Sequence, residues 1–148
     1  MWKSKNNDNF TIILYKELLT TMKYSIDKNE KYSIFSFEDD RIDSLVAPKL
    51  KSEFITLFQS GTQNLILDLT KVRYVDSSGL SALLVANRLC GEAEGFFVLA
   101  GVNDHVMKLL AISKLDIVFN ILTTIEESIE AIMSSSNDKN TDNESTEE

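Results

Sequence analysis

Residue types that support cross-links and tight turns are scarce in this 148-residue sequence, which has one cysteine, one proline and five glycines. A single cysteine excludes an intrachain disulfide and a metal site built from several cysteines. Because nothing indicates an oxidised framework, a cytoplasmic location is expected. Cys90 falls at the end of a predicted helix, so we interpret it as a small apolar core residue rather than a nucleophile.

Long apolar runs and an excess of basic residues are also absent. No stretch reaches the ~20 apolar residues that a membrane span needs, and the polar residues 6–9 stand where a signal peptide has its apolar core. The net charge of −8 argues against nucleic acid as the main partner, because phosphate backbones are bound by clustered Lys and Arg. No basic amphipathic helix is present, so a membrane surface is not an expected partner either.

Groups that support catalysis or metal binding are few. His105 is the single histidine, so a serine hydrolase would have to pair it with Ser77 or Ser78, and neither serine stands in a G-x-S-x-G turn. The acidic segment 39–43 lacks the spacing of a calcium loop and its final Glu. No phosphate-binding glycine motif is present. The sequence therefore predicts a protein that is not an enzyme and that binds no metal or cofactor. A serine hydrolase that uses His105 is kept only as a further hypothesis.

Composition divides the chain into three parts. Residues 1–21 are predicted to be an appended arm, because the first strand pattern begins after Met22, which is a candidate natural start. Residues 22–133 are predicted to form one compact domain. Residues 134–148 contain no apolar residue and carry five acidic residues and one lysine, which is half of the net charge of the chain. Such a segment cannot bury a core, so it is predicted to be disordered.

The pattern within residues 22–133 predicts an α/β fold, with an N-terminal β-hairpin, a mixed but mostly parallel sheet of about four to five strands, and about four helices. The hairpin covers residues 22–38, and the segment 39–43 is interpreted as a polar loop. The unbroken apolar strand 65–69 is typical of the centre of a parallel sheet. Further strands are predicted at 96–99 and within 115–121. The expected inward faces of the helices are Ala47, Leu50, Phe54, Leu57 and Phe58; Leu80, Leu83, Leu84, Ala86 and Cys90; Val106, Leu109 and Leu110; and Ile125, Ile129 and Ile132.

An Asp-Ser-Ser-Gly motif at residues 76–79 lies between the predicted central strand and the helix that starts near Leu80. Two adjacent hydroxyls at such a junction have two interpretations. The open N–H groups and positive dipole end of a helix favour an anion, such as a phosphate added to Ser77 or Ser78. The same position also suits a serine that only caps the helix.

Residues 64–80 resemble the central signature of STAS domains, and in particular that of stand-alone bacterial anti-sigma factor antagonists. The shared pattern is a buried strand ending in Asp-Leu, a spacer, an aliphatic residue, Asp-Ser-Ser-Gly and a Leu that opens a helix. Weaker matches at 40–50, 101–115 and 124–132 follow in the family's order. The resemblance covers residues 22–133 and implies a single STAS-type domain.

The resemblance also implies a mechanism, partner switching. In that family the unmodified antagonist binds an anti-sigma factor that is also a serine kinase, which releases a sigma factor. The kinase then phosphorylates the second serine of the motif, which matches Ser78, and a PP2C-type phosphatase restores binding. This chain is then a phosphoprotein of signal transduction and transcription regulation, and ATP belongs to its kinase. The implied partner-binding residues are Asp43, Asp76, Ser77, Ser78, Gly79 and Leu80.

One alternative and two departures from the family pattern remain. The alternative is a STAS interaction module without phosphorylation, in a signalling or transport-associated complex, where Ser78 only caps the helix. Lys114 stands where the family often has glycine, which predicts a rebuilt turn if positive φ is needed there. Arg73 stands where a small polar residue is common, and we interpret it as solvated.

Overall fold

The computed structural model describes residues 11–12 and 22–144, so most of the predicted N-terminal arm lies outside the described residues. The elements in chain order are β1 (Tyr24–Lys28), β2 (Ser33–Phe37), β3 (Arg41–Ile42), α2 (Ala47–Gln59), β4 (Leu65–Asp68), β5 (Tyr74–Val75), α3 (Ser77–Glu92), β6 (Phe97–Ala100), α4 (Asp104–Ile112), β7 (Asn120–Leu122) and α5 (Ile125–Glu144).

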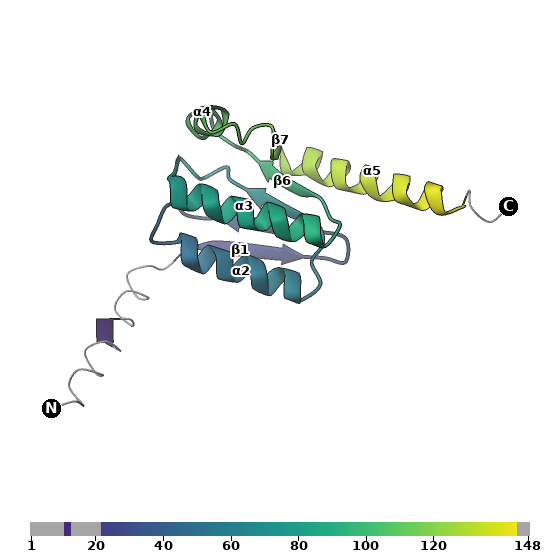
Figure 1. Ribbon diagram of the computed structural model, residues 1–148, viewed down its shortest axis with the longest axis horizontal. Coiled ribbons are helices and arrows are strands. Elements are labelled where there is room, and N and C mark those ends of the chain that lie inside the picture. The colour runs from purple at the N-terminus through teal and green to yellow at the C-terminus, as the bar shows by residue number, and fades with distance from the viewer. Residues whose placement is uncertain (1–10, 13–21, 145–148) are drawn as a thin grey trace.

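The main sheet has five strands in the order β1-β2-β4-β6-β7 (Figure 1). The β1–β2 hairpin is antiparallel, and the other three pairings are parallel. This confirms the predicted α/β fold with a mixed, mostly parallel sheet. The central strand is β4, where Leu65, Ile66 and Leu67 have no exposed surface. The last strand, Asn120–Leu122, begins within the predicted segment 115–121 and ends one residue beyond it.

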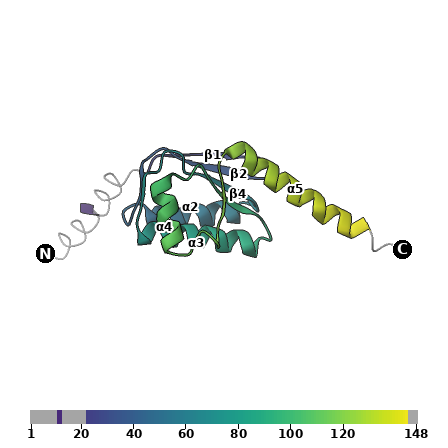
Figure 2. The ribbon, with the colours of Figure 1, turned by 90° about the horizontal axis from the view of Figure 1, so that it is seen from above.

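The sheet is covered unequally on its two faces. Helices α2, α3 and α4 lie on one face, and α5 lies on the other (Figure 2). Because side chains alternate along a strand, neighbours in β4 serve different cores. Leu67 packs into the larger cluster under α2 and α3, whereas Ile66 packs with Ala100 and Ile132 under α5.

The prediction of the buried helical faces is wrong for one residue. Leu84 was expected to point inward, but 39% of its surface is exposed. The buried stripe of α3 runs through Leu83, Ala86 and Cys90, at intervals of three and four residues. A stripe with that spacing follows one side of the helix, and Leu84 lies about 100° away from Leu83 around the axis.

The ends of two helices also differ from expectation. Cys90 was predicted to lie at the end of its helix, but α3 continues to Glu92, and Glu94 takes the left-handed position with φ of 57°. At the end of α4, Lys114 likewise has φ of 57°, and the Leu115 N–H donates to the Leu110 carbonyl at 2.8 Å. The turn is therefore kept with a lysine in a left-handed conformation, and the prediction of a rebuilt loop is wrong.

Residues 134–144 are helical where disorder was predicted, and residues 145–148 lie outside the described residues. Helix α5 continues through residue 134 as far as Glu144 and extends past the sheet in Figure 1. The hydroxyls of Ser134, Ser135 and Ser136 donate to the carbonyls four residues earlier, at 2.9, 2.9 and 3.0 Å. A helix that is already nucleated by packed turns gains one backbone bond for each added residue, so it extends beyond its apolar contacts.

Candidate functional site

The 76–79 motif lies beside a short parallel ladder that joins β3 to β5. Arg41 is opposite Tyr74, and Ile42 is opposite Val75. The carbonyl of Ile42 also accepts the N–H of Asp76 at 3.2 Å. The acidic segment that we predicted to be a loop therefore contains a strand. A two-residue strand is too short to show an alternating pattern, and only the pairing reveals it.

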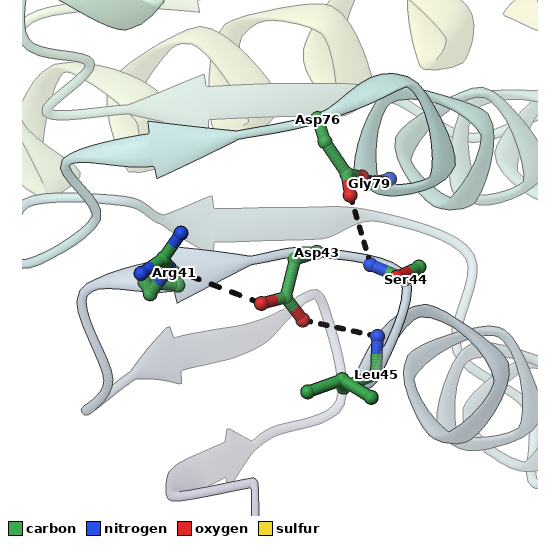
Figure 3. Close-up of polar contacts among 6 residues, drawn as sticks. All are labelled: Arg41, Asp43, Ser44, Leu45, Asp76 and Gly79. Carbon is green, nitrogen blue, oxygen red and sulfur yellow. Dashed lines mark hydrogen bonds and ion pairs between the residues drawn. The ribbon is translucent and has the colours of Figure 1, made fainter.

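Asp76 is the N-cap of α3 and links two segments of the site. Its Oδ1 accepts the Gly79 N–H at 2.9 Å, within the first turn of the helix. Its Oδ2 accepts the Ser44 N–H at 3.0 Å, in the turn that leads into α2 (Figure 3). The interpretation of a motif serine as the N-cap is therefore wrong. Ser77 and Ser78 are the first two residues of α3.

The two hydroxyls have no structural role in the described part of the chain. Ser77 is exposed and Ser78 is partly exposed. Neither side chain has a hydrogen-bond partner among residues 22–138, so neither hydroxyl is committed to the fold. Both stand in the first turn of α3, where the backbone N–H groups and the dipole favour a negative group.

Gly79 and Leu80 lie beneath this surface rather than on it. Gly79 is buried, and a Cβ atom there would lie 2.3 Å from the carbonyl oxygen of Ile42. Only glycine allows α3 to approach β3 this closely. Leu80 is 9% exposed and belongs to the larger core. These two predicted site residues are therefore buried, and their packing fixes the position of the first turn of α3, which carries both serines.

Asp43 stands across the turn from Asp76. Its Oδ1 accepts the Leu45 N–H at 3.0 Å, and its Oδ2 lies 3.8 Å from Nε of Arg41 (Figure 3). The Arg41 guanidinium lies over the ring of Tyr74, 4.8 Å from its centre. Asp76 and Asp43 accept hydrogen bonds from the N–H groups of the consecutive residues Ser44 and Leu45. The structure therefore brings the two predicted carboxylates to the same turn.

Leu45, Arg41 and Tyr74 belong to this site but were not predicted. Leu45 exposes 69% of its surface, and Tyr74 exposes 41%. Periodicity could not find Leu45, because it lies in a turn where no face is defined. Arg41 was noted only as part of the family's loop pattern. Its stacking on Tyr74 depends on the β3–β5 pairing, which has no signal in the sequence.

The remaining candidates show no catalytic arrangement in the part of the chain that the structure describes. His105 is exposed at the start of α4, and no hydrogen bond joins it to Ser77 or Ser78 among these residues. Burial raises the pKa of the Cys90 thiol to about 12, so the thiol is neutral. Residues 22–138 hold no group of three His, Cys, Asp or Glu side chains suited to a metal ion. No helix within the described ranges is long and apolar enough to cross a membrane.

The chain matches known proteins over the whole α/β domain. The STAS domain model matches residues 23–130. The anti-sigma-B factor antagonist of Listeria monocytogenes is 32% identical over 104 residues, which cover 68% of this chain and 90% of that protein.

Two solved structures share the fold. An anti-sigma factor antagonist from Mycobacterium paratuberculosis matches with a TM-score of 0.68 at 20% identity, over 77% of this chain and 96% of that one. Bacillus SpoIIAA in its phosphorylated form matches with a TM-score of 0.60 at 17% identity, over 74% of this chain and 99% of that one. The chain therefore belongs to the STAS domain family, among the bacterial anti-sigma factor antagonists.

Proposed function

We propose that this protein is the switchable antagonist of an anti-sigma factor that is also a serine kinase. The unmodified form binds the kinase, and phosphorylation of Ser78 releases it. The family consists of regulators rather than enzymes, so the protein is the substrate of the kinase and needs no cofactor. A PP2C-type phosphatase resets the switch in the cytoplasm.

The observation that carries the proposal is the division of roles within the motif. Asp76 caps α3, so the Ser78 hydroxyl is available for modification without loss of the helix. A serine that served as the cap would accept an N–H of the first turn, and neither motif hydroxyl has a hydrogen-bond partner among residues 22–138. SpoIIAA, a protein of the same fold, exists in a phosphorylated form, which supports phosphorylation as the modification.

Electrostatics supports a change in affinity rather than a change in fold. A phosphate adds about −1.5 to −2 charges, which the first turn of a helix tolerates. Asp76, two residues before Ser78, repels it, and a docked partner would bury it. If burial of the dianion costs ~3 kcal/mol, the affinity falls about a hundredfold. That change is enough for exchange of partners.

The test uses the full chain and the anti-sigma factor kinases encoded in the same genome. By isothermal titration with ADP present, we expect Ser78→Ala to bind as tightly as the wild type and Ser78→Asp to bind about a hundredfold more weakly. Incubation with ATP should add one phosphate to the wild type and to Ser77→Ala, but none to Ser78→Ala. Equal affinities of the Ala and Asp variants would refute the switch. Absence of phosphate on the wild type would favour a non-phosphorylated STAS interaction module.

A further inference from the structure

Leu45 has an exposure that the fold does not require. It shows 69% of its surface in the turn between β3 and α2. The backbone of this turn is nevertheless held firmly. Asp43 accepts the N–H of Leu45, and Asp76 accepts the N–H of the preceding Ser44. A large apolar side chain is therefore presented to solvent on a fixed backbone, directly after Ser44, whose N–H binds the N-cap Asp76.

Arg41 is a second exposed side chain, and it lies in the strand that leads into this turn. Its side chain is 61% exposed, and its guanidinium is stacked on Tyr74. The ion pair with Asp43 involves Nε, and no hydrogen bond from the terminal nitrogens is found among residues 22–138. Stacking on the ring limits the rotation of the guanidinium. The planar group therefore has unused donors in a fixed orientation, which matches a carboxylate.

One residue holds both groups in place. The Oδ1 of Asp43 fixes the turn that presents Leu45, and its Oδ2 attracts Arg41 (Figure 3). Side chains that are ordered before binding lose little entropy when they bind. Arg and large apolar side chains seated in pockets carry much of the energy of protein interfaces, and the contacts around them mostly exclude water.

We propose that Leu45 and Arg41 are the two anchors by which this protein holds its anti-sigma factor. Leu45 enters an apolar pocket of the partner, and Arg41 pairs through two parallel hydrogen bonds with a carboxylate beside that pocket. Asp43 is a positioning residue that acts through both anchors. The inference rests on the function proposed above, and it adds the chemistry of the partner's surface. Because Asp76 joins this turn to α3, a phosphate on Ser78 adds its charge next to the anchored contact.

The experiment measures the affinity of full-length variants for the kinase that binds the wild type, by isothermal titration with ADP. We expect Leu45→Asp to weaken binding about 30-fold or more, as for a typical interface anchor. Arg41→Gln should weaken it about tenfold, and Arg41→Lys should restore only part of that loss, because an ammonium cannot form the paired bonds. The matched control is Ile117→Asp, at a residue 82% exposed between α4 and β7, which should bind as the wild type does.

A mutant cycle tests the positioning role of Asp43. We expect Asp43→Ala to weaken binding in the wild type, but to add little to the loss in a variant that already carries both Leu45→Asp and Arg41→Gln. Independent, additive losses would show that Asp43 contacts the partner itself. Urea midpoints should be unchanged by Leu45→Asp, because its side chain lies outside the core.

The outcomes separate this inference from the proposed function. If Ser78→Asp abolishes binding while Leu45→Asp and Arg41→Gln bind normally, the anchors are wrong and the switch stands. If the wild type binds no such kinase, both proposals are overturned. If Leu45→Asp instead converts a dimer into a monomer and leaves the affinity for the kinase unchanged, the surface serves a second copy of the chain, and the anchor assignment is refuted.

Discussion

Replacement of Gly79 by alanine is expected to destabilise the protein from within its motif. A Cβ atom there would lie 2.3 Å from the carbonyl oxygen of Ile42 and 2.8 Å from Cγ1 of Val75. Unstrained contacts are about 3.5 Å, so the first turn of α3 must move back by roughly 1 Å. That shift also lengthens the bond from the Asp76 N–H to the Ile42 carbonyl, which is 3.2 Å in the structure.

The expected magnitude follows from three contributions. Overpacking costs about 1–3 kcal/mol, and the weakened hydrogen bond costs about 1 kcal/mol. Alanine regains up to ~1 kcal/mol over glycine in a helix. We therefore expect Gly79→Ala to lower the free energy of unfolding by about 2 kcal/mol. Urea denaturation followed by far-UV circular dichroism would show this as a midpoint about 1 M lower.

The same substitution elsewhere in α3 provides the control. Apart from its chain neighbours and the backbone of its own helix, no atom of the described residues lies within 4 Å of a Cβ built at Gly91, so alanine fits there without displacement. We expect Gly91→Ala to raise the free energy of unfolding by about 0.5 kcal/mol, because glycine is a poor helix former. The two variants should thus shift the midpoint in opposite directions. If Gly79→Ala is no less stable than Gly91→Ala, the close approach of α3 to β3 is not what requires glycine in the motif.

Three further changes have expected signs. Lys114→Gly should raise the free energy of unfolding by about 1 kcal/mol, since it relieves a left-handed lysine, and a thermal melt that shows no gain would contradict this. Asp76→Ala should lower it by about 2 kcal/mol because two N–H groups lose their acceptor, and Asp76→Asn should lower it by about 1 kcal/mol. Because burial raises the pKa of Cys90 from 9.0 to about 12, the native state retains a proton that the unfolded chain loses. The contribution of the protonated Cys90 thiol to the free energy of unfolding is therefore full below pH 9 and is lost as the pH rises toward 12. Iodoacetamide at pH 8 should label Cys90 in urea but not in the native protein.

Long elements could be predicted because their patterns are set by burial over many residues. The unbroken apolar stretch 65–69 predicted a central strand, and β4 is the central strand of the sheet. Likewise, the spacing of Ile125, Ile129 and Ile132 predicted the helix that covers the second face. Disorder was predicted for residues 134–144 because their composition offers no apolar side chain to bury. A helix that already exists can nevertheless be extended by local hydrogen bonds alone.

The candidate site could be predicted only in part. The motif 76–79 and the carboxylate of Asp43 are visible in the sequence, and the family resemblance singled out Ser78. Spacing alone did not separate the capping residue from the free hydroxyls. That separation needs the direction of one side chain, and the structure shows Asp76 on the Gly79 N–H. The exposure of Leu45 and the stacking of Arg41 likewise depend on contacts between segments that lie over 30 residues apart in the chain.

The sequence by itself therefore determined the α/β class, the order of the main elements and the position of the Asp-Ser-Ser-Gly motif at the start of a helix. Periodicity and composition depend on residues that are close together in the chain, so they predict such local features well. Only the tertiary structure decided which residue caps the helix, why Gly79 must be glycine and that Leu45 is exposed in the turn bonded to Asp76. These features arise where β3 meets β5 and where one carboxylate spans Ser44 and Gly79. Contacts of that kind join residues distant in the chain, and no local pattern encodes them.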